Sequence, residues 1–256
     1  MDKTLLKGLS MLEMLVESSG EARSVEDVAA MTGLSRSNAH RTLQTLISAG
    51  YVEKSPSIGG YRSTLKLFEL GVRQMQSLDV RKLAQPFISQ LAKDTGETVH
   101  LSVLDGLDVI YIDKVDSLQP IRAYSQIGGR GPAYAVATGK ALLAAQNEEY
   151  IEAYKNKMER FTSETIYDFE SLKIELAKIR RVGYAVNRGE WREGVGGVAA
   201  VIYDGFDVPV AAIGLSGPLN RLSVARMKDL APKVLSCSQE LSKALGYRRG
   251  YFGESV

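Results

Sequence analysis

The chain has 256 residues, of which 45% are hydrophobic and 24% charged, and this composition is typical of a soluble globular protein. Its 32 basic and 30 acidic residues nearly cancel, so the net charge of +2 indicates no particular partner. No apolar run reaches the roughly 18 residues that a membrane span needs, and the N-terminus lacks the cleavage pattern of a signal peptide, so we expect no membrane partner.

The first 34 residues predict two helices. Apolar residues recur at Leu5, Leu9, Leu12 and Val16, which indicates one apolar stripe on a helix that ends at residues 18–20. A second, shorter helix begins after Ser24, whose side chain can cap the backbone and which is followed three residues later by an acid. Its expected apolar side is Val25, Val28, Ala29 and Met31, and its expected stop is Gly33.

A third helix is predicted from Ser35 to Gly50 after a tight turn, and two helices joined in this way are the helix-turn-helix signature. Its inward face consists of apolar residues, and its outward face carries donors and acceptors that suit base edges and phosphates. A solvated polar face in another three-helix domain is the alternative. The turn, the polar face and the basic segment that follows together favour DNA binding.

A short strand, a Gly/Pro-rich turn over residues 55–60 and a second strand then predict a β-hairpin wing. Residues 35–64 contain four basic residues and one acidic residue, which gives this stretch a net charge of +3. We expect Lys54 and Arg62 to meet backbone phosphates. The full set of candidate DNA-contacting residues is Ser35, Arg36, Ser37, Asn38, His40, Arg41, Gln44, Lys54 and Arg62.

Residues 65–96 predict a helical connector, within which Pro86 should kink the helix or begin a new one, and Gly96 should end it. A stiff connector would let the two halves transmit orientation to each other. The expected domains are therefore a winged helix-turn-helix domain at 1–64, the connector at 65–96, and an effector-binding and oligomerisation domain at 97–256.

The second half mixes strands with helices. A hairpin is predicted from Thr98 to Val115 across the Asp105–Gly106 turn. Further strands are expected at residues 121–126, 184–188, 197–203 and 208–216, and helices at 138–145, 147–157, 168–182 and 223–245. Hairpins interleaved with helices predict an α+β fold with a mainly antiparallel sheet.

Few residues in the second half suit catalysis. The Gly-rich stretch 128–140 departs from a Walker A loop, and it is either an anion site at a helix N-terminus or a tight turn. We interpret His100 as a structural histidine. We interpret Cys237, the only cysteine, as a small buried hydrophobic residue rather than a redox sensor. A single cysteine also favours a reducing, cytoplasmic location. Trp191 is either a pocket lid or a surface anchor. We expect no metal, no cofactor and no enzymatic activity.

Taken together, the motifs resemble those of IclR-type transcriptional regulators along nearly the whole chain. The segments that carry the resemblance are VEDVAAMTGLSRSNAHRTLQTLISAGYVE, GYRSTLKLFELG, TGETVHLSVLDGLDVIYIDKV, GGRGPAYAVATGKALLA and EGVGGVAAVIYDGFDVPVAAIGLSGPLNRL. The resemblance implies a winged-helix DNA domain and a GAF-like domain that binds a small organic acid or related metabolite. It also implies homodimers through the DNA domains, often paired into homotetramers.

The same resemblance implies which residues contact the effector. They are Ala137, Thr138, Asn187, Val195, Gly197, Gly214 and Ser216. The sequence departs from the family pattern at Tyr134, where histidine is common, at Val136, where threonine or serine is common, and at Gly197, where cysteine is frequent. Thr138 also stands where a small or apolar residue is frequent. The pocket walls should therefore differ from those of relatives.

These observations lead to the hypothesis of a ligand-responsive transcriptional regulator, acting as repressor or activator, that binds a pseudo-palindromic double-stranded operator. Two alternatives stay open. One is an enzyme acting on a small acid that is fused to a DNA-binding domain, and the other is a scaffold protein without a small ligand.

Overall fold

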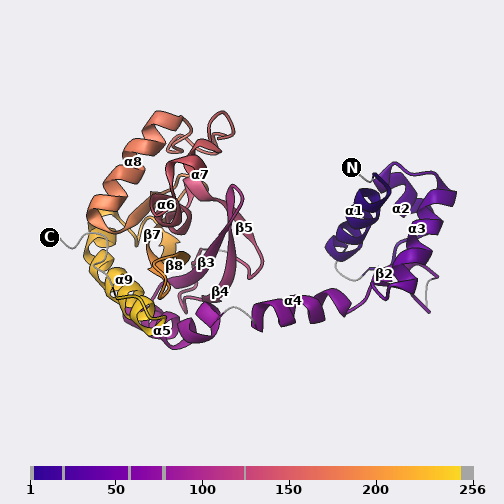
Figure 1. Ribbon diagram of the computed structural model, residues 1–256, viewed down its shortest axis with the longest axis horizontal. Helices are drawn as coiled ribbons and strands as arrows, with labels where there is room; N and C mark the ends of the chain where they lie inside the picture. Colours follow the sequence, from indigo (N-terminus) through magenta and orange to yellow (C-terminus); the bar gives the residue numbers. More distant parts are fainter. Residues whose placement is uncertain (1–2, 19–20, 57–58, 77–78, 124, 249–256) are drawn as a thin grey trace. The chain divides into compact units, whose positions relative to one another are not determined.

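The computed structural model describes residues 3–18, 21–56, 59–76, 79–123 and 125–248 (Figure 1). The chain divides into two compact units, Met1–Ser77 and Leu78–Val256. In the described part of the chain, every helix is too short or too polar to cross a membrane.

The first unit is a winged helix-turn-helix domain, as the sequence predicted. Its elements are α1 (Lys3–Glu17), α2 (Val25–Thr32), α3 (Arg36–Ser48), β1 (Val52–Lys54), β2 (Tyr61–Ser63) and α4 (Lys66–Gln76). The two strands pair antiparallel and form the wing. Ser57 and Ile58 of the predicted wing turn lie outside the described residues.

Local hydrogen bonds fix the turn between α2 and α3. Ser24 accepts a bond from the N–H of Asp27, whose carboxylate in turn accepts from the N–H of Ser24. Gly33 ends α2 in the left-handed conformation at φ 62°, and Ser35 then caps α3 by accepting from the N–H of Asn38. The position at which α3 begins is therefore fixed by residues next to it in the sequence.

The prediction of which α1 residues face the core is wrong in part. Leu12 is buried, but the core of this unit also takes Met11 and Leu15, while Leu5, Leu9 and Val16 are exposed. The segment is apolar on most sides, so spacing alone could not show which face meets α2 and α3. Met31 of α2, predicted to face the core, is likewise 58% exposed.

The predicted connector consists of two helices that belong to different units. The first is α4, and the second, α5 (Asp79–Thr95), packs on α9 and β3. Ser77 and Leu78 lie outside the described residues. Pro86 lies inside α5, so no new helix begins there. Burial of Ala84, Ile88 and Leu91 holds the helix together despite the missing N–H of the proline.

The second unit is built on an antiparallel six-stranded sheet in the order β5-β4-β3-β8-β7-β6. Its strands are β3 (Thr98–Asp105), β4 (Asp108–Val115), β5 (Arg130–Pro132), β6 (Ala185–Arg188), β7 (Val195–Tyr203) and β8 (Pro209–Pro218). Its remaining helices are the 3-10 turn η1 (Ala133–Ala135), α6 (Ala137–Ala144), α7 (Glu148–Glu152), α8 (Phe169–Val182) and α9 (Val224–Ala244). The predicted α+β class is confirmed.

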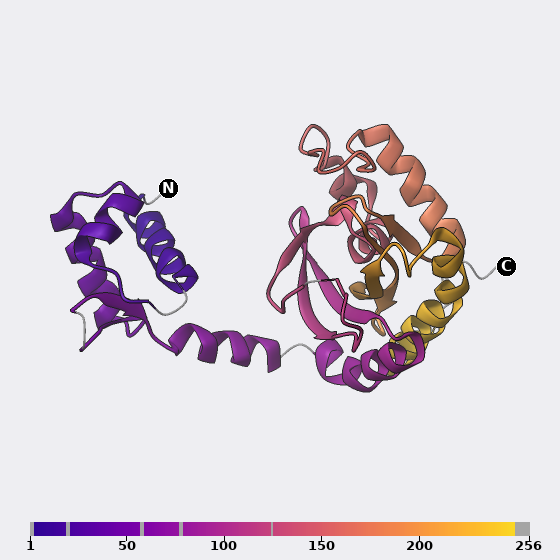
Figure 2. The same ribbon diagram turned by 180° about the vertical axis from the view of Figure 1, so that it is seen from behind.

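Helices cover both faces of this sheet, as the two opposite views show (Figures 1 and 2). Along β7, Val198, Ala200 and Ile202 pack with α5 and α9, whereas Ala199 and Val201 pack with α6 and α8. The alternation of side chains along a strand divides the core into these two layers. On one of these faces, α6 packs on the central strands β3, β8 and β7.

Two element predictions are wrong. Residues 121–126 form no strand where they are described, because the free edge of β4 is taken by Arg130–Pro132 instead, and Tyr124 lies outside the described residues. Arg130 reinforces that pairing by binding the carboxylates of Asp105 and Asp108. The helix predicted over 147–157 is the short α7, after which the chain turns and reaches a positive φ at Asn156.

Candidate DNA interface and ligand pocket

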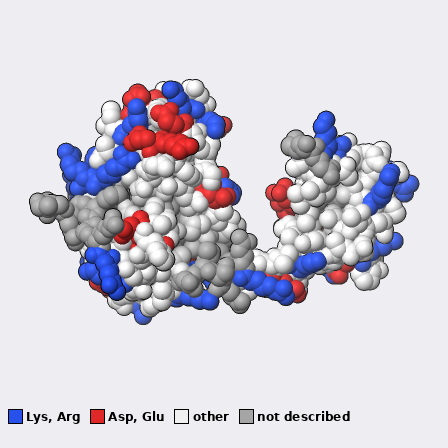
Figure 3. Space-filling model, viewed as in Figure 1, with Lys and Arg blue, Asp and Glu red and all other residues white. Residues whose placement is uncertain are grey.

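The outward face of α3 is polar and exposed. Its residues Ser37, Asn38, His40, Arg41 and Gln44 all face solvent, while Ala39 and Leu43 anchor the opposite side in the core. The Nη2 of Arg41 donates to the Oδ1 of Asn38 at 3.1 Å, which orients the guanidinium along the helix surface. Figure 3 shows basic side chains over the α2–α3 part of this unit.

Two of the predicted cations are paired within the unit. Arg36 lies 2.6 Å from Glu26, and Arg62 lies 2.6 Å from Glu53. Glu26 precedes the stretch in which the sequence count found a net charge of +3, so that count overstated the positive charge beside α3. Within the described residues Lys54 has no acidic partner. Lys54 and Arg41 are therefore the predicted cations least neutralised by neighbouring acids.

The second unit contains a pocket between the start of α6, strands β3, β7 and β8, and the loop that joins β6 to β7. All seven predicted effector-contacting residues line it: Ala137, Thr138, Asn187, Val195, Gly197, Gly214 and Ser216. They come from four elements separated by up to about eighty residues of chain. The structure thus gathers these residues at one place, around a cavity of about 50 Å³.

Two glycines allow the backbone to close around this pocket. A Cβ on Gly139 would lie 2.2 Å from the carbonyl oxygen of Ala133, so only glycine lets the first turn of α6 pack on η1. A Cβ on Gly197 would lie 2.6 Å from the carbonyl oxygen of Leu215. A cysteine, which the family resemblance led us to expect at this position, would not fit without a backbone shift. This departure from the family pattern changes the wall of the pocket.

The structure adds pocket residues that the sequence did not single out as ligand contacts. They are His100, Tyr111, Ala123, Ser125, Val136, Trp191, Arg192 and Leu215. The hairpin that carries His100 and Tyr111 was predicted from the sequence. The sequence did not show that the centres of these two rings lie 4.9 Å apart, or that Ser125 lies beside His100. Trp191 lines the pocket, so the interpretation that links it to a pocket has support from the structure.

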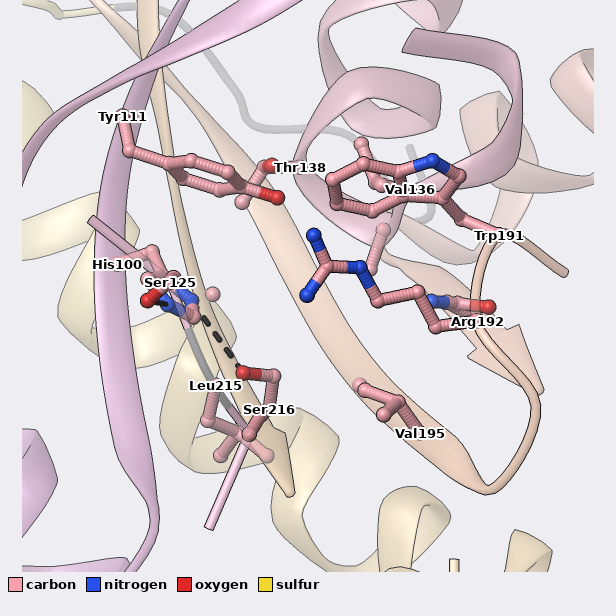
Figure 4. A pocket seen from close by; sticks show the side chains of 15 residues that line it. His100, Tyr111, Ser125, Val136, Thr138, Trp191, Arg192, Val195, Leu215 and Ser216 are labelled. Carbon is pink, nitrogen blue, oxygen red and sulfur yellow. Dashed lines mark hydrogen bonds between the residues drawn. The ribbon is translucent and has the colours of Figure 1, made fainter. Parts of the chain in front are cut away.

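His100 forms part of the wall of the pocket. Its Nε2 lies 2.6 Å from the Oγ of Ser125 and its Nδ1 lies 3.4 Å from the Oγ of Ser216 (Figure 4). Burial, and to a smaller extent the nearby charge of Lys114, together lower the pKa of His100 to about 4, while Asp116 opposes the shift. The imidazole is therefore neutral at pH 7, with one ring nitrogen donating and the other accepting.

The neutral state of His100 makes stability depend on pH. Because the histidine of the unfolded chain keeps a pKa near 6.5 and that of the folded chain is about 4, the unfolded state binds more protons between these values. We expect the free energy of unfolding to fall by as much as about 3 kcal/mol as pH decreases from 6.5 to 4. The His100→Asn variant should lack this part of the slope in urea denaturation followed by tryptophan fluorescence. An equal slope in both proteins would contradict the prediction.

The β6–β7 loop supplies Trp191 and Arg192. The guanidinium of Arg192 lies 4.3 Å from the centre of the Trp191 ring. In Figure 4 it extends into the space between Tyr111, Thr138 and Ser216. Burial raises the pKa of Tyr111 to about 12, although Arg192 opposes the shift, so the phenol stays protonated and can donate a hydrogen bond.

A buried ion pair ties this loop to α6. The fully buried Nζ of Lys140 lies 2.7 and 2.6 Å from the two carboxylate oxygens of Glu190 and 3.7 Å from Glu175. The Oδ1 of Asn187 accepts a hydrogen bond from the N–H of Glu190 at 2.9 Å. The hydroxyl of Thr165 donates to the backbone carbonyl oxygen of Glu190. Lys140 and Glu190 therefore hold the start of α6 and the loop of Trp191 and Arg192 in one arrangement.

Comparisons with known proteins match both units. A model described as "IclR helix-turn-helix domain" matches residues 4–56, and one described as "Bacterial transcriptional regulator IclR C-terminal" matches residues 72–243. The chain is 34% identical to the HTH-type transcriptional regulator XynR of Escherichia coli, over 94% of this chain and 96% of that one. It is 33% identical to the acetate operon repressor of Salmonella typhimurium, over 96% and 91% of the two chains.

Solved structures agree with these relatives. The IclR of Thermotoga maritima matches with a TM-score of 0.78 and 32% identity, covering 95% of this chain and 99% of that one. The C-terminal domain of Escherichia coli KdgR matches with a TM-score of 0.60 and 30% identity, covering 66% of this chain and 100% of that domain. Fold and site define a transcriptional regulator with a helix-turn-helix domain and a second, pocket-bearing domain. The chain belongs to the IclR family of bacterial transcriptional regulators.

Proposed function

We propose that this protein binds a pseudo-palindromic operator as a homo-oligomer through α3 and the wing, and that a small organic acid in the pocket of the second unit changes its affinity for DNA. The observation that carries the proposal is the convergence of seven residues, selected from the family pattern, around one pocket. A regulator whose second domain only oligomerised would have no need of such a pocket.

The DNA part of the proposal rests on the exposed face of α3. Ser37, Arg41 and Gln44 project from one side of a helix whose other side is fixed in the core, as a helix that enters the major groove requires. Arg36, Asn38 and His40 flank them, and we expect Lys54 and Arg62 of the wing to meet phosphates. A two-fold symmetric site needs two copies of the unit, so we infer that the DNA-bound form is at least a dimer.

Selection of duplexes from a random-sequence library by the full chain tests the first part. We expect the recovered duplexes to share two inverted half-sites with centres one helical turn or a multiple apart. Recovery of unrelated sequences, bound with equal affinity, would contradict operator recognition. The mass of the complex with the selected duplex, measured by analytical ultracentrifugation, gives the number of copies bound.

A further inference from the structure

The polar side chains that line the pocket form two chemically different groups. The family pattern predicted only some of these side chains. The family-matched positions supply neutral groups, namely the hydroxyls of Thr138 and Ser216 and the amide of Asn187. Among the described residues that line the pocket, Arg192 alone carries a permanent charge. It comes from the loop between β6 and β7 and is not one of the seven positions selected from the family pattern.

The first group of side chains suits a carboxylate. The guanidinium of Arg192 is planar and offers paired N–H donors that match the two oxygens of a carboxylate. Its position is restricted because it stacks on Trp191, and the loop is anchored by the buried pair of Lys140 and Glu190. The protonated hydroxyl of Tyr111 lies on the same side and can add a donor (Figure 4).

The second group of side chains is uncharged. Ser125, His100 and Ser216 form a row in which the imidazole lies between two hydroxyl groups. Each member can donate or accept once its neighbours rotate, so these side chains suit a ligand group that does both, as a hydroxyl does. Lys114, whose charge acts on His100, is 3.0 Å from Asp116 and donates to the carbonyl oxygen of Ser125, so its charge is already balanced within the protein.

We propose that Arg192 determines the ligand class of this pocket, by pairing with the carboxylate of a short monocarboxylic acid whose hydroxyl group meets Ser216 and His100. The inference rests on the proposed function, because it takes the pocket to be the effector site. The cavity of about 50 Å³ favours a short carbon chain. An apolar wall of Val136, Val195 and Leu215 would contact the carbon atoms between the two polar groups.

Calorimetric titration of the full chain tests this assignment with matched probes. The panel consists of lactate, glycerate and threonate, their uncharged amides, propionate as the acid without a hydroxyl, and malate as a dicarboxylate. We expect at least one hydroxy acid of the panel to bind, and to bind at least tenfold more tightly than its amide, than propionate and than malate. Equal affinity for acid and amide, or no binding by any hydroxy acid, would overturn the inference.

Variants then assign the effect to Arg192. Arg192→Gln should weaken binding of the acid at least tenfold and leave the amide unchanged, and Arg192→Lys should retain part of the preference. Arg188→Gln is the matched control, because Arg188 is exposed on the neighbouring strand and does not line this pocket. If Arg192→Gln weakened the binding of acid and amide by the same factor, Arg192 would only shape the pocket, and the assignment would be overturned. Duplex selection does not depend on these outcomes, so a failure here is distinguishable from a failure of operator recognition.

Discussion

Replacing Lys140 by methionine is expected to lower the free energy of unfolding by about 3–5 kcal/mol, because it leaves the carboxylate of Glu190 buried without a counter-charge. Burial already raises the pKa of Glu190, and Lys140 is the main group that opposes this shift, with a smaller contribution from the N–H of Arg188. Glu175 is less affected, since it also pairs with Lys178 at 3.2 Å. In the variant, Glu190 should become neutral at a higher pH, so the loss of stability should shrink as pH falls.

Urea denaturation measures this loss in the free energy of unfolding. Trp191 is the only tryptophan of the chain and adjoins Glu190, so its fluorescence reports on the unit that contains the pair. The matched control is the double variant Lys140→Met/Glu190→Leu, which removes both charges and should recover a large part of the loss. A single variant that loses less than about 1 kcal/mol, or a double variant no more stable than the single one, would show that the pair is not a structural anchor.

Replacing Arg41 by alanine is expected to weaken binding to the selected duplex by about 1–3 kcal/mol, which is roughly 5- to 150-fold. Arg41 lies at the middle of the exposed face of α3, and its side chain is oriented by Asn38. Because it is proposed to contact base edges, the loss should be largest for the selected sequence and small for unrelated duplexes. Fluorescence anisotropy at one fixed salt concentration measures both affinities.

Lys54→Ala provides the contrasting control. Lys54 lies on the wing strand β1, where contact with a phosphate is expected. Its removal should weaken all duplexes by a similar factor and reduce the slope of log affinity against log salt by about one. If Arg41→Ala bound the selected duplex as tightly as the unaltered protein, the placement of α3 in the major groove would be wrong.

The first unit could be predicted closely because its boundaries are set by local chemistry. Ser24, Gly33 and Ser35 cap or stop helices through bonds to residues three or four positions away, and such signals are readable in sequence. The buried face of α1 depends instead on which neighbours it meets. Its apolar residues occupy most of its surface, so the choice of Met11 and Leu15 over Leu5 and Leu9 was decided by tertiary packing.

The pocket shows a similar division. Thr138, Asn187 and Ser216 could be placed through the family resemblance, because motifs carry their positions. Tyr111 could not, although its hairpin was predicted, because the register of β3 and β4 shifts between Leu101 and Ser102 and this shift is not readable in the sequence. Ser125 could not, because it lies in a segment that was mistaken for a strand. Arg192 had no motif to mark it, and the partner of Lys140, fifty residues away, became visible only in the fold.

The dependence of DNA affinity on pocket occupancy is the most direct measure of how this protein works. The affinity of the full chain for its selected duplex is measured by anisotropy without ligand and with a saturating concentration of a hydroxy acid from the calorimetric panel. We expect the dissociation constant to change by about 5- to 150-fold, and the duplex to change the affinity for the acid by the same factor. Identical dissociation constants, with calorimetry showing the acid bound, would contradict the proposed coupling between pocket and DNA.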